Sequence, residues 1–164
     1  MLTVIKNMGQ LNFGALMQVY AQTNRENAED RYAGEPEAVG MHLVEQDFYQ
    51  YLRECFFVTP GAFYAVWGPG GRYVSALRME PYRDGLLLEA LETAPEERQE
   101  GNAVKLIKAV LTVLPDQKVY THIHKKNRAS IRTHEACGFR RVLDYAVYAD
   151  GSVLPNSITM VYET

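Results

Sequence analysis

Cysteine is scarce in this chain of 164 residues, and its two copies, Cys55 and Cys137, stand far apart in apolar surroundings. Two well-separated cysteines do not form the framework of a disulfide-rich secreted domain. The first ten residues also lack the long apolar core and the cleavage site of a signal peptide. We therefore expect a cytoplasmic protein whose two thiols are reduced and buried.

Long apolar runs and an excess of charge are also missing. No run approaches the roughly 20 apolar residues of a membrane-spanning helix, so we expect no membrane partner. Seventeen basic residues are opposed by 20 acidic ones, for a formal net charge of -3. That balance gives no electrostatic reason to expect nucleic acid as a partner. The short basic cluster Lys125, Lys126 and Arg128 is local and suits at most a small anion.

Apolar residues are plentiful, at 47% of the chain, which is enough for a core without disulfides or a structural metal. The length fits one domain over residues 1–164. Periodicity and turn residues predict strand 1–5, helix 13–23, loop 24–40, helix 41–57, strands 62–67, 72–82 and 86–93, helix 101–114, strand 118–124, helix 128–136, and strands 139–148 and 157–162. This order predicts an α/β fold, a twisted mixed sheet of about seven strands with about four helices on both faces.

The most informative stretch is residues 86–103, in which an apolar strand ends and a helix begins with RQEGNA at 98–103. The first turn of a helix offers unpaired N–H groups and the positive end of its dipole. Gly101 and Ala103 leave room for a diphosphate to approach the main chain, and Arg98 adds a planar donor fork suited to phosphate. Taken alone, these six residues fit an anion site and an ordinary helix start equally well.

A second pattern, NRASIRTHEACGF at 127–139, opens a short helix with Asn127 and closes it in Gly138-Phe139. With both patterns in this order around a strand, the chain resembles the GNAT N-acetyltransferase superfamily, closely over residues 86–139 and loosely over the rest. In that family the first pattern, Gln/Arg-x-x-Gly-x-Gly/Ala, binds the diphosphate of coenzyme A, and the second lines the pantetheine arm and thiol. The pair is far more specific than either pattern alone.

The resemblance implies an acetyl-coenzyme A-dependent N-acetyltransferase that moves the acetyl group directly to a primary amine. It also implies a sheet that opens between strands 86–93 and 118–124 to admit the pantetheine. Leu91 and Thr93 match positions whose backbone pairs with pantetheine amides, while Asn127 and Ser130 match the pantetheine-contacting helix start. The positions that match the diphosphate loop are Arg98, Gln99, Gly101, Asn102 and Ala103.

His134 stands where the family often has a tyrosine, four residues before the glycine of Gly-Phe, placed to protonate the departing thiolate. A neutral imidazole still has one N–H to donate, so we expect that His134 can act as general acid with a different pH dependence. The alternative is a histidine on the helix surface, with the thiolate leaving unaided or through water.

The acceptor amine must also lose a proton, because an alkyl ammonium resembling lysine has a pKa of about 10.4. The candidate bases are Glu89 and Glu92 on strand 86–93. They lie three residues apart, so a regular strand turns them to opposite faces, and only one faces the acceptor unless a bulge intervenes. We favour Glu92 because it is nearer the end of the strand.

Two alternatives remain open. His122 and His124 share a strand face and would form a zinc site if His134 or a strand glutamate supplied a third ligand, which would indicate a metal-dependent hydrolase. No further cluster has ligand spacing, so we assign no metal and expect these histidines to line the acceptor cleft or a sheet edge. The second alternative is a non-catalytic acetyl-coenzyme A sensor, which the replacement of the family's tyrosine by His134 favours.

The sequence does not identify the acceptor, which we expect to be a small-molecule or peptide amine. A homodimer is an expectation from the family resemblance alone.

Overall fold

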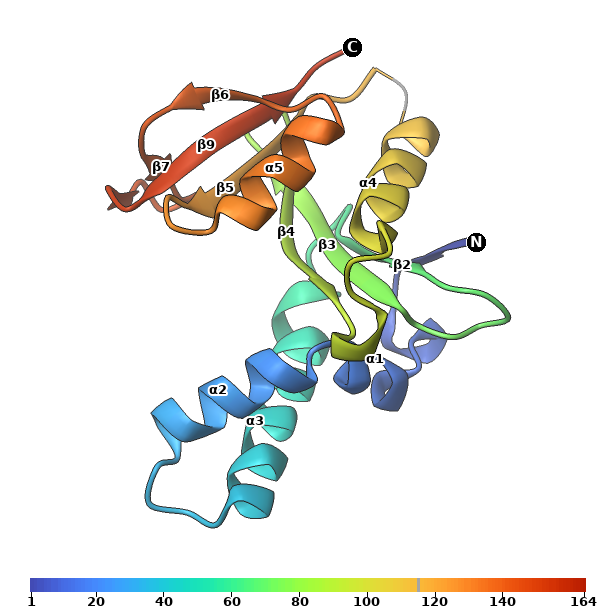
Figure 1. The fold of residues 1–164 in the computed structure, drawn as a ribbon, viewed down its shortest axis with the longest axis vertical. Coiled ribbons are helices and arrows are strands. Elements are labelled where there is room, and N and C mark those ends of the chain that lie inside the picture. The colour runs from blue at the N-terminus through green and yellow to red at the C-terminus, as the bar shows by residue number, and fades with distance from the viewer. Residues whose placement is uncertain (115) are drawn as a thin grey trace.

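The computed structural model describes residues 1–114 and 116–164 of the chain. Its main sheet has seven strands in the order β1-β2-β3-β4-β5-β9-β6 (Figure 1). These strands are β1 Leu2–Ile5, β2 Phe63–Trp67, β3 Ser75–Tyr82, β4 Gly85–Thr93, β5 Val119–His124, β6 Arg140–Leu143 and β9 Ser157–Tyr162. Neighbours pair antiparallel except β4 and β5, which are parallel. The expected mixed sheet of seven strands is confirmed.

The predicted strand 139–148 is wrong in one respect, because it is broken into β6 and a separate short strand. That strand, β7 (Ala146–Val147), pairs with β8 (Val153–Leu154) in a small hairpin outside the main sheet. The hydroxyl of Thr159 on β9 donates to the carbonyl of Tyr145, which directs the chain out of the sheet just before β7.

In the part of the chain that the structure describes, five α-helices accompany the sheet: α1 Phe13–Val19, α2 Ala21–Arg31, α3 Glu37–Tyr51, α4 Asn102–Val113 and α5 Arg128–Ala136. A π-helical turn, Leu52–Phe56, continues α3. The predicted helices 101–114 and 128–136 agree with α4 and α5. Within the described residues, no helix is long and apolar enough to cross a membrane.

The N-terminal helices correct the sequence-based prediction. The expected helix 13–23 is two helices that meet at Tyr20, and most of the expected loop 24–40 is helical. Because α2 is polar around most of its surface, it has no apolar stripe to predict a helix. It is held instead by packing on α3, where Gly40 is so close to Ala28 that a Cβ on Gly40 would lie 3.4 Å from the Cβ of Ala28.

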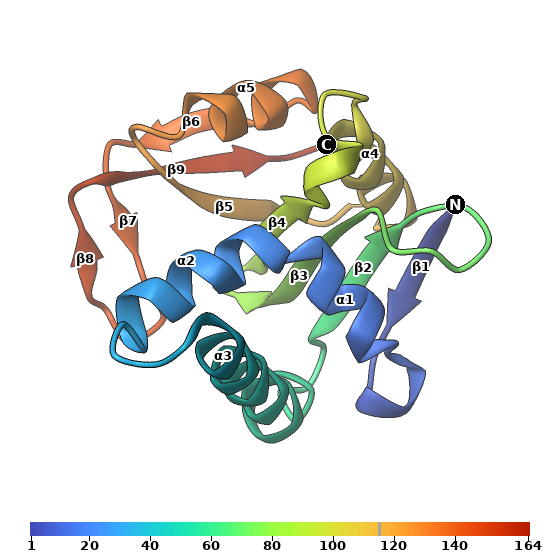
Figure 2. The same cartoon turned by 60° about the horizontal axis from the view of Figure 1, so that its bottom comes forward.

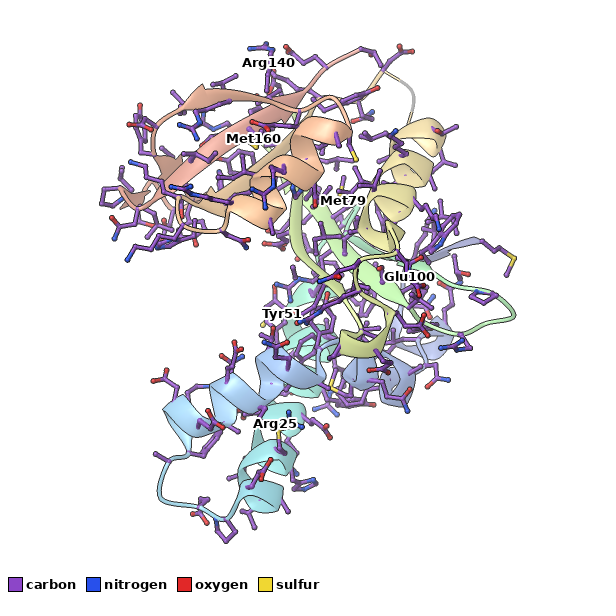
Figure 3. The ribbon with its side chains drawn as sticks, in the orientation of Figure 1. Arg25, Tyr51, Met79, Glu100, Arg140 and Met160 are labelled. Carbon is purple, nitrogen blue, oxygen red and sulfur yellow. The ribbon has the colours of Figure 1, made fainter. Side chains whose placement is uncertain are left out.

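Among the described residues, the two largest apolar cores lie on opposite faces of the sheet. On one face α4 and α5 pack on the strands, and this core includes Met79 on β3 and Met160 on β9 (Figure 3). On the other face α1 and the end of α3 pack on β1, β2 and β3, as the view from that side shows (Figure 2). The cysteines divide between these settings: both are free thiols, but only Cys137 is buried, so the expectation that Cys55 is buried is wrong.

Two irregularities of β4 shape the middle of the sheet. Its pairing with β3 shifts so that Ala76 lies opposite Glu92 and Arg78 opposite Glu89, which leaves one extra residue on β4. Ala90, inside this β-bulge, has a φ of +52°. On its other side β4 pairs with β5 only from Leu86 to Leu88. Beyond that point the two strands diverge (Figure 1), as the family resemblance implied.

Candidate active site

A cleft of about 740 Å³ lies between the end of β4, the start of α4 and the start of α5. It brings together all nine residues to which the sequence assigned cofactor contacts, from both motifs. Glu92, one of the two expected bases, also lines it. The other lining residues, which the sequence did not single out, are Gln22, Glu97, Val104, Ala129 and Thr133.

The start of α4 forms one wall of the cleft. Gln99 and Gly101 have φ values of +64° and +74°, which turn the backbone sharply before the helix begins. The Asn102 side chain donates to the carbonyl of Glu97 over 2.9 Å and braces this turn. The Lys105 N–H bonds back to the Gly101 carbonyl over 3.0 Å, so the N–H groups just before it are the ones without helical partners. This wall therefore suits an anion.

Arg98 is held at the rim of the cleft by three groups. Its Nε donates to the carbonyl of Thr93 over 3.2 Å, one terminal nitrogen donates to the side chain of Gln22, and the other lies 3.6 Å from Glu92 Oε1. The guanidinium is therefore positioned before any ligand arrives, and its charge is offset in part by one carboxylate.

The bulge resolves the question of the two glutamates. Because Glu89 and Glu92 pair with β3 residues two positions apart, both project from the face that α1 and α3 cover. Glu92 accepts from the Thr23 hydroxyl over 2.7 Å. Burial raises the pKa of Glu92, while Thr23 and Arg98 oppose that rise. The Glu92 carboxylate is thus already engaged by Thr23 and Arg98.

Glu89 does not line the cleft. Its Oε1 lies 3.6 Å from Arg78 Nε, and the two side chains are mostly buried. Burial raises the pKa of Glu89, the Arg78 charge opposes that rise, and nearby Glu80 adds to it. The bulge itself is supported from α1, because the hydroxyl of Tyr20, at the end of that helix, donates to the carbonyl of Ala90.

His134 lies inside the protein rather than on the cleft wall, with 1% of its surface exposed. Its Nδ1 is 2.8 Å from the carbonyl of Ser130, and its ring packs edge-on against Phe139. A carbonyl only accepts, so Nδ1 carries the proton, and burial lowers the pKa of this histidine. The single N–H of neutral His134 therefore already donates to the Ser130 carbonyl, which argues against His134 as the general acid. The alternative prediction, that His134 lies on the surface of the helix, is wrong because the side chain is buried.

The start of α5 has the geometry that the second motif requires. The side chain of Asn127 caps this helix by accepting from the Ser130 N–H over 3.1 Å. Asn127 and Ser130 both line the cleft, and Thr133, one turn further along α5, lies beside them.

His122 and His124 lie in different surroundings. His122 packs edge-on between the rings of Tyr82 and Tyr148, at centroid distances of 5.4 and 5.8 Å. The exposed His124 accepts the Lys126 N–H at Nδ1 over 3.1 Å. Across residues 1–114 and 116–164, no group of three or more His, Cys, Asp and Glu side chains is arranged to hold a metal ion.

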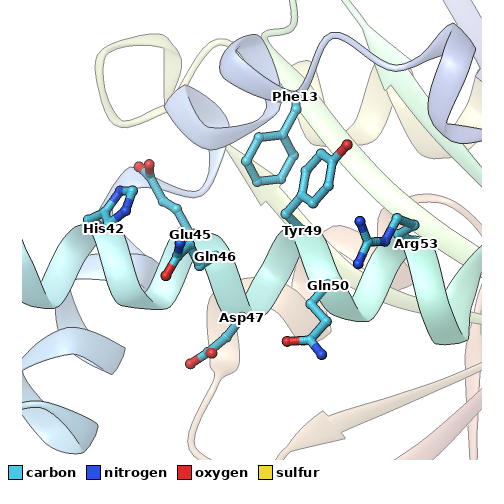
Figure 4. Close-up of a pocket in the computed structure, with 8 residues that line it drawn as sticks. All are labelled: Phe13, His42, Glu45, Gln46, Asp47, Tyr49, Gln50 and Arg53. Carbon is cyan, nitrogen blue, oxygen red and sulfur yellow. The ribbon is translucent and has the colours of Figure 1, made fainter.

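A separate hollow of about 530 Å³ runs along the outer side of α3 from His42 to Arg53, with Phe13 and Tyr49 between them (Figure 4). It contains no residue of either motif. The cleft between the end of β4 and the starts of α4 and α5 is therefore the candidate active site.

Several solved structures share this fold. The PaiA N-acetyltransferase of Thermoplasma acidophilum, in complex with coenzyme A, aligns with a TM-score of 0.63 and 12% identity over 100% of this chain and 99% of its own. The ribosomal-protein-S18-alanine N-acetyltransferase of Escherichia coli aligns with a TM-score of 0.58 and 16% identity, over 99% of this chain and 94% of its own. A mutant spermidine N-acetyltransferase of Vibrio cholerae aligns with a TM-score of 0.60 and 18% identity, over 99% of this chain and 93% of its own. The fold is thus that of N-acetyltransferases.

Residues 21–139 match the model of the acetyltransferase (GNAT) family, and the chain belongs to this family. The family resemblance that the two motifs indicated is confirmed. The donor that this family uses is acetyl-coenzyme A, as expected. A comparison with curated protein sequences found no match.

Proposed function

We propose that this protein binds acetyl-coenzyme A in the cleft between the end of β4 and the starts of α4 and α5, and that it transfers the acetyl group directly to a primary amine. The observation that carries the proposal is the convergence of both motifs on one cleft of about 740 Å³. The start of α4 and Arg98 receive the diphosphate, and the start of α5 with Asn127 and Ser130 borders the pantetheine.

Direct transfer is supported by the state of the thiols. Cys137 is buried outside the cleft, where burial raises its pKa and so disfavours a nucleophilic thiolate. Cys55 lies on the π-helical turn after α3, also outside the cleft. Since neither thiol is placed to carry the acetyl group, the amine itself attacks the thioester.

The acceptor is proposed only as a primary amine. The proteins of similar fold act on acceptors as different as a ribosomal-protein alanine and spermidine, and fold does not define substrate.

Titration calorimetry with acetyl-coenzyme A tests the proposal, with Arg98→Ala beside the natural protein. Hydrogen bonds to charged groups contribute about 1.5–3 kcal/mol, so we expect Arg98→Ala to raise Kd about 10- to 150-fold. Arg53→Ala is the matched control, because Arg53 pairs with Glu54 on the exposed surface of the π-helical turn, outside the cleft. If the natural protein does not bind acetyl-coenzyme A, the proposal is wrong.

A non-catalytic acetyl-coenzyme A sensor is the second candidate, and one observation favours it. His134 replaces the family's usual tyrosine, yet its N–H is bonded to Ser130 and its ring is buried. A thiol-release assay over a panel of primary amines separates the two, because a sensor binds acetyl-coenzyme A without releasing coenzyme A.

A further inference from the structure

The opening between β4 and β5 has a second side, away from the cofactor motifs. Leu88 and Thr121 are the last residues that pair across these parallel strands. The next residue on each strand, Glu89 and His122, therefore stands directly beside the opening. Both project from the face opposite α4 and α5, because their neighbours Leu88 and Ile123 belong to the core beneath those helices.

His122 is a partly buried base whose two ring nitrogens have no hydrogen-bond partner among the described residues. Both of its ring nitrogens are inaccessible to solvent, and neither forms a hydrogen bond within the part of the chain that the structure describes. Tyr82 and Tyr148 flank the ring but offer it only their faces and edges. Leaving a buried polar group unpaired costs about 1–3 kcal/mol, which a ligand that donates a hydrogen bond to the ring would recover.

The segment that covers His122 is held in place from the sheet. The Tyr82 hydroxyl donates to the carbonyl of Val147 on β7, and Tyr148 follows directly. The β7–β8 hairpin and α2 lie on the same side of the sheet, opposite α4 and α5 (Figure 2).

Resting on the proposed function, we propose that His122 is the catalytic residue that takes the proton from the acceptor amine, and that Glu89 faces the incoming ammonium across the opening. The two glutamates are less available for that proton. Glu92 accepts from Thr23 and lies beside Arg98, and Glu89 is paired with Arg78.

The proposed step balances as follows. One N–H bond of the ammonium breaks, and the proton moves to a ring nitrogen of His122. The freed nitrogen lone pair forms a bond to the thioester carbonyl carbon, and the C–S bond breaks with its electron pair on sulfur. A second proton of the nitrogen passes to the thiolate, which leaves the amide and the free thiol of coenzyme A. His122 then loses its proton to solvent.

The surroundings of His122 define its expected pH dependence. Burial and the charge of Arg83, in the β3–β4 turn, lower the pKa of His122. The other titratable groups that face it are Tyr82 from β3, Glu89 from β4, His124 from β5 and Tyr148 from the segment after β7. This lowered pKa favours the neutral ring of His122, which is the form that can accept a proton.

The test compares the natural protein with His122→Gln, using ethylamine and trifluoroethylamine as probe acceptors of similar shape. Ethylamine is almost entirely protonated near neutral pH, whereas trifluoroethylamine is already neutral there. We expect His122→Gln to lower kcat/KM for ethylamine about 100-fold or more, within the range of general base catalysis. The loss with trifluoroethylamine is expected to be at least tenfold smaller. The variant should also lose the fall in kcat/KM at acidic pH.

His42→Gln is the matched control, because it makes the same change at an exposed position of α3. Equal losses with both amines, or an unchanged pH profile in His122→Gln, would overturn the role of His122 while leaving the proposed function intact. If the natural protein binds acetyl-coenzyme A but acetylates neither amine at high concentration, transfer to simple primary amines is refuted, and the role of His122 with it. Calorimetry of His122→Gln with acetyl-coenzyme A, expected to match the natural protein, separates these failures from misfolding.

Discussion

Gly101 offers a sharp test of the cofactor cleft, because its backbone and its open side have separate consequences. Its φ of +74° is in the left-handed region, and a Cβ built there meets no atom within 4 Å. Gly101→Ala therefore creates no clash in the ligand-free chain. It adds only the cost of the left-handed conformation, about 1 kcal/mol, and a methyl group in the space that we assign to the diphosphate.

The two effects have different magnitudes and different assays. A loss of about 1 kcal/mol in the free energy of unfolding lowers Tm by about 2–4 °C in a chain of this size. Displacement of a phosphate from one charged hydrogen bond costs at least about 1.5 kcal/mol, so Kd for acetyl-coenzyme A rises about tenfold or more. Calorimetric titration measures the second effect and thermal unfolding the first.

Gly151 supplies the matched control. It lies in the turn between β7 and β8 with a φ of +86°, and its Cβ position is also free of neighbours within 4 Å. We expect Gly151→Ala to lower Tm by a similar amount and to leave Kd unchanged. If the two variants bind acetyl-coenzyme A equally well, the reasoning that places the diphosphate at the start of α4 is refuted.

Three further predictions follow from the site. Tyr20→Phe removes the hydroxyl that donates to the Ala90 carbonyl, so thermal unfolding should show a free energy of unfolding that is lower by about 0.5–1.5 kcal/mol. Steady-state kinetics should show a higher KM for acetyl-coenzyme A. Unchanged values would show that the bulge does not depend on this hydrogen bond. Glu92→Gln removes one negative charge beside Arg98, so calorimetry should give a Kd for acetyl-coenzyme A that is about two- to fivefold lower. Acetyl transfer should be retained, and a large loss of kcat would instead indicate that Glu92 is the base. Burial lowers the pKa of His134, so the unfolded chain binds a proton at this histidine more readily than the folded chain does. The free energy of unfolding should therefore fall as pH drops below about 6.5, by at most about 1.4 kcal/mol per pH unit. Thermal unfolding of His134→Gln between about pH 7 and about pH 5 should show a weaker fall, and an equal fall would contradict the buried, neutral state of His134.

The sequence alone determined the elements that hold the cofactor motifs. The apolar stripe of α4 and the capped start of α5 are local signals, and both helices form where they predict. Each motif directly follows a strand of the same sheet, and strands β4 and β5 are parallel, so their carboxyl ends meet at one edge. Connectivity of this kind is enough to gather Arg98 and Asn127 into one cleft.

Only the tertiary structure decided where the candidate catalytic side chains point. The strand period placed Glu89 and Glu92 on opposite faces, and the bulge at Ala90, stabilised by Tyr20 from 70 residues away, placed them on the same one. Likewise His134 and His122 are both histidines next to motif segments, yet packing against Phe139 buries the first, while β7–β8 and Tyr82 cover the second. Register, bulges and burial depend on residues far away in the chain, so a local pattern determines helices and strands but not the direction in which a catalytic side chain points.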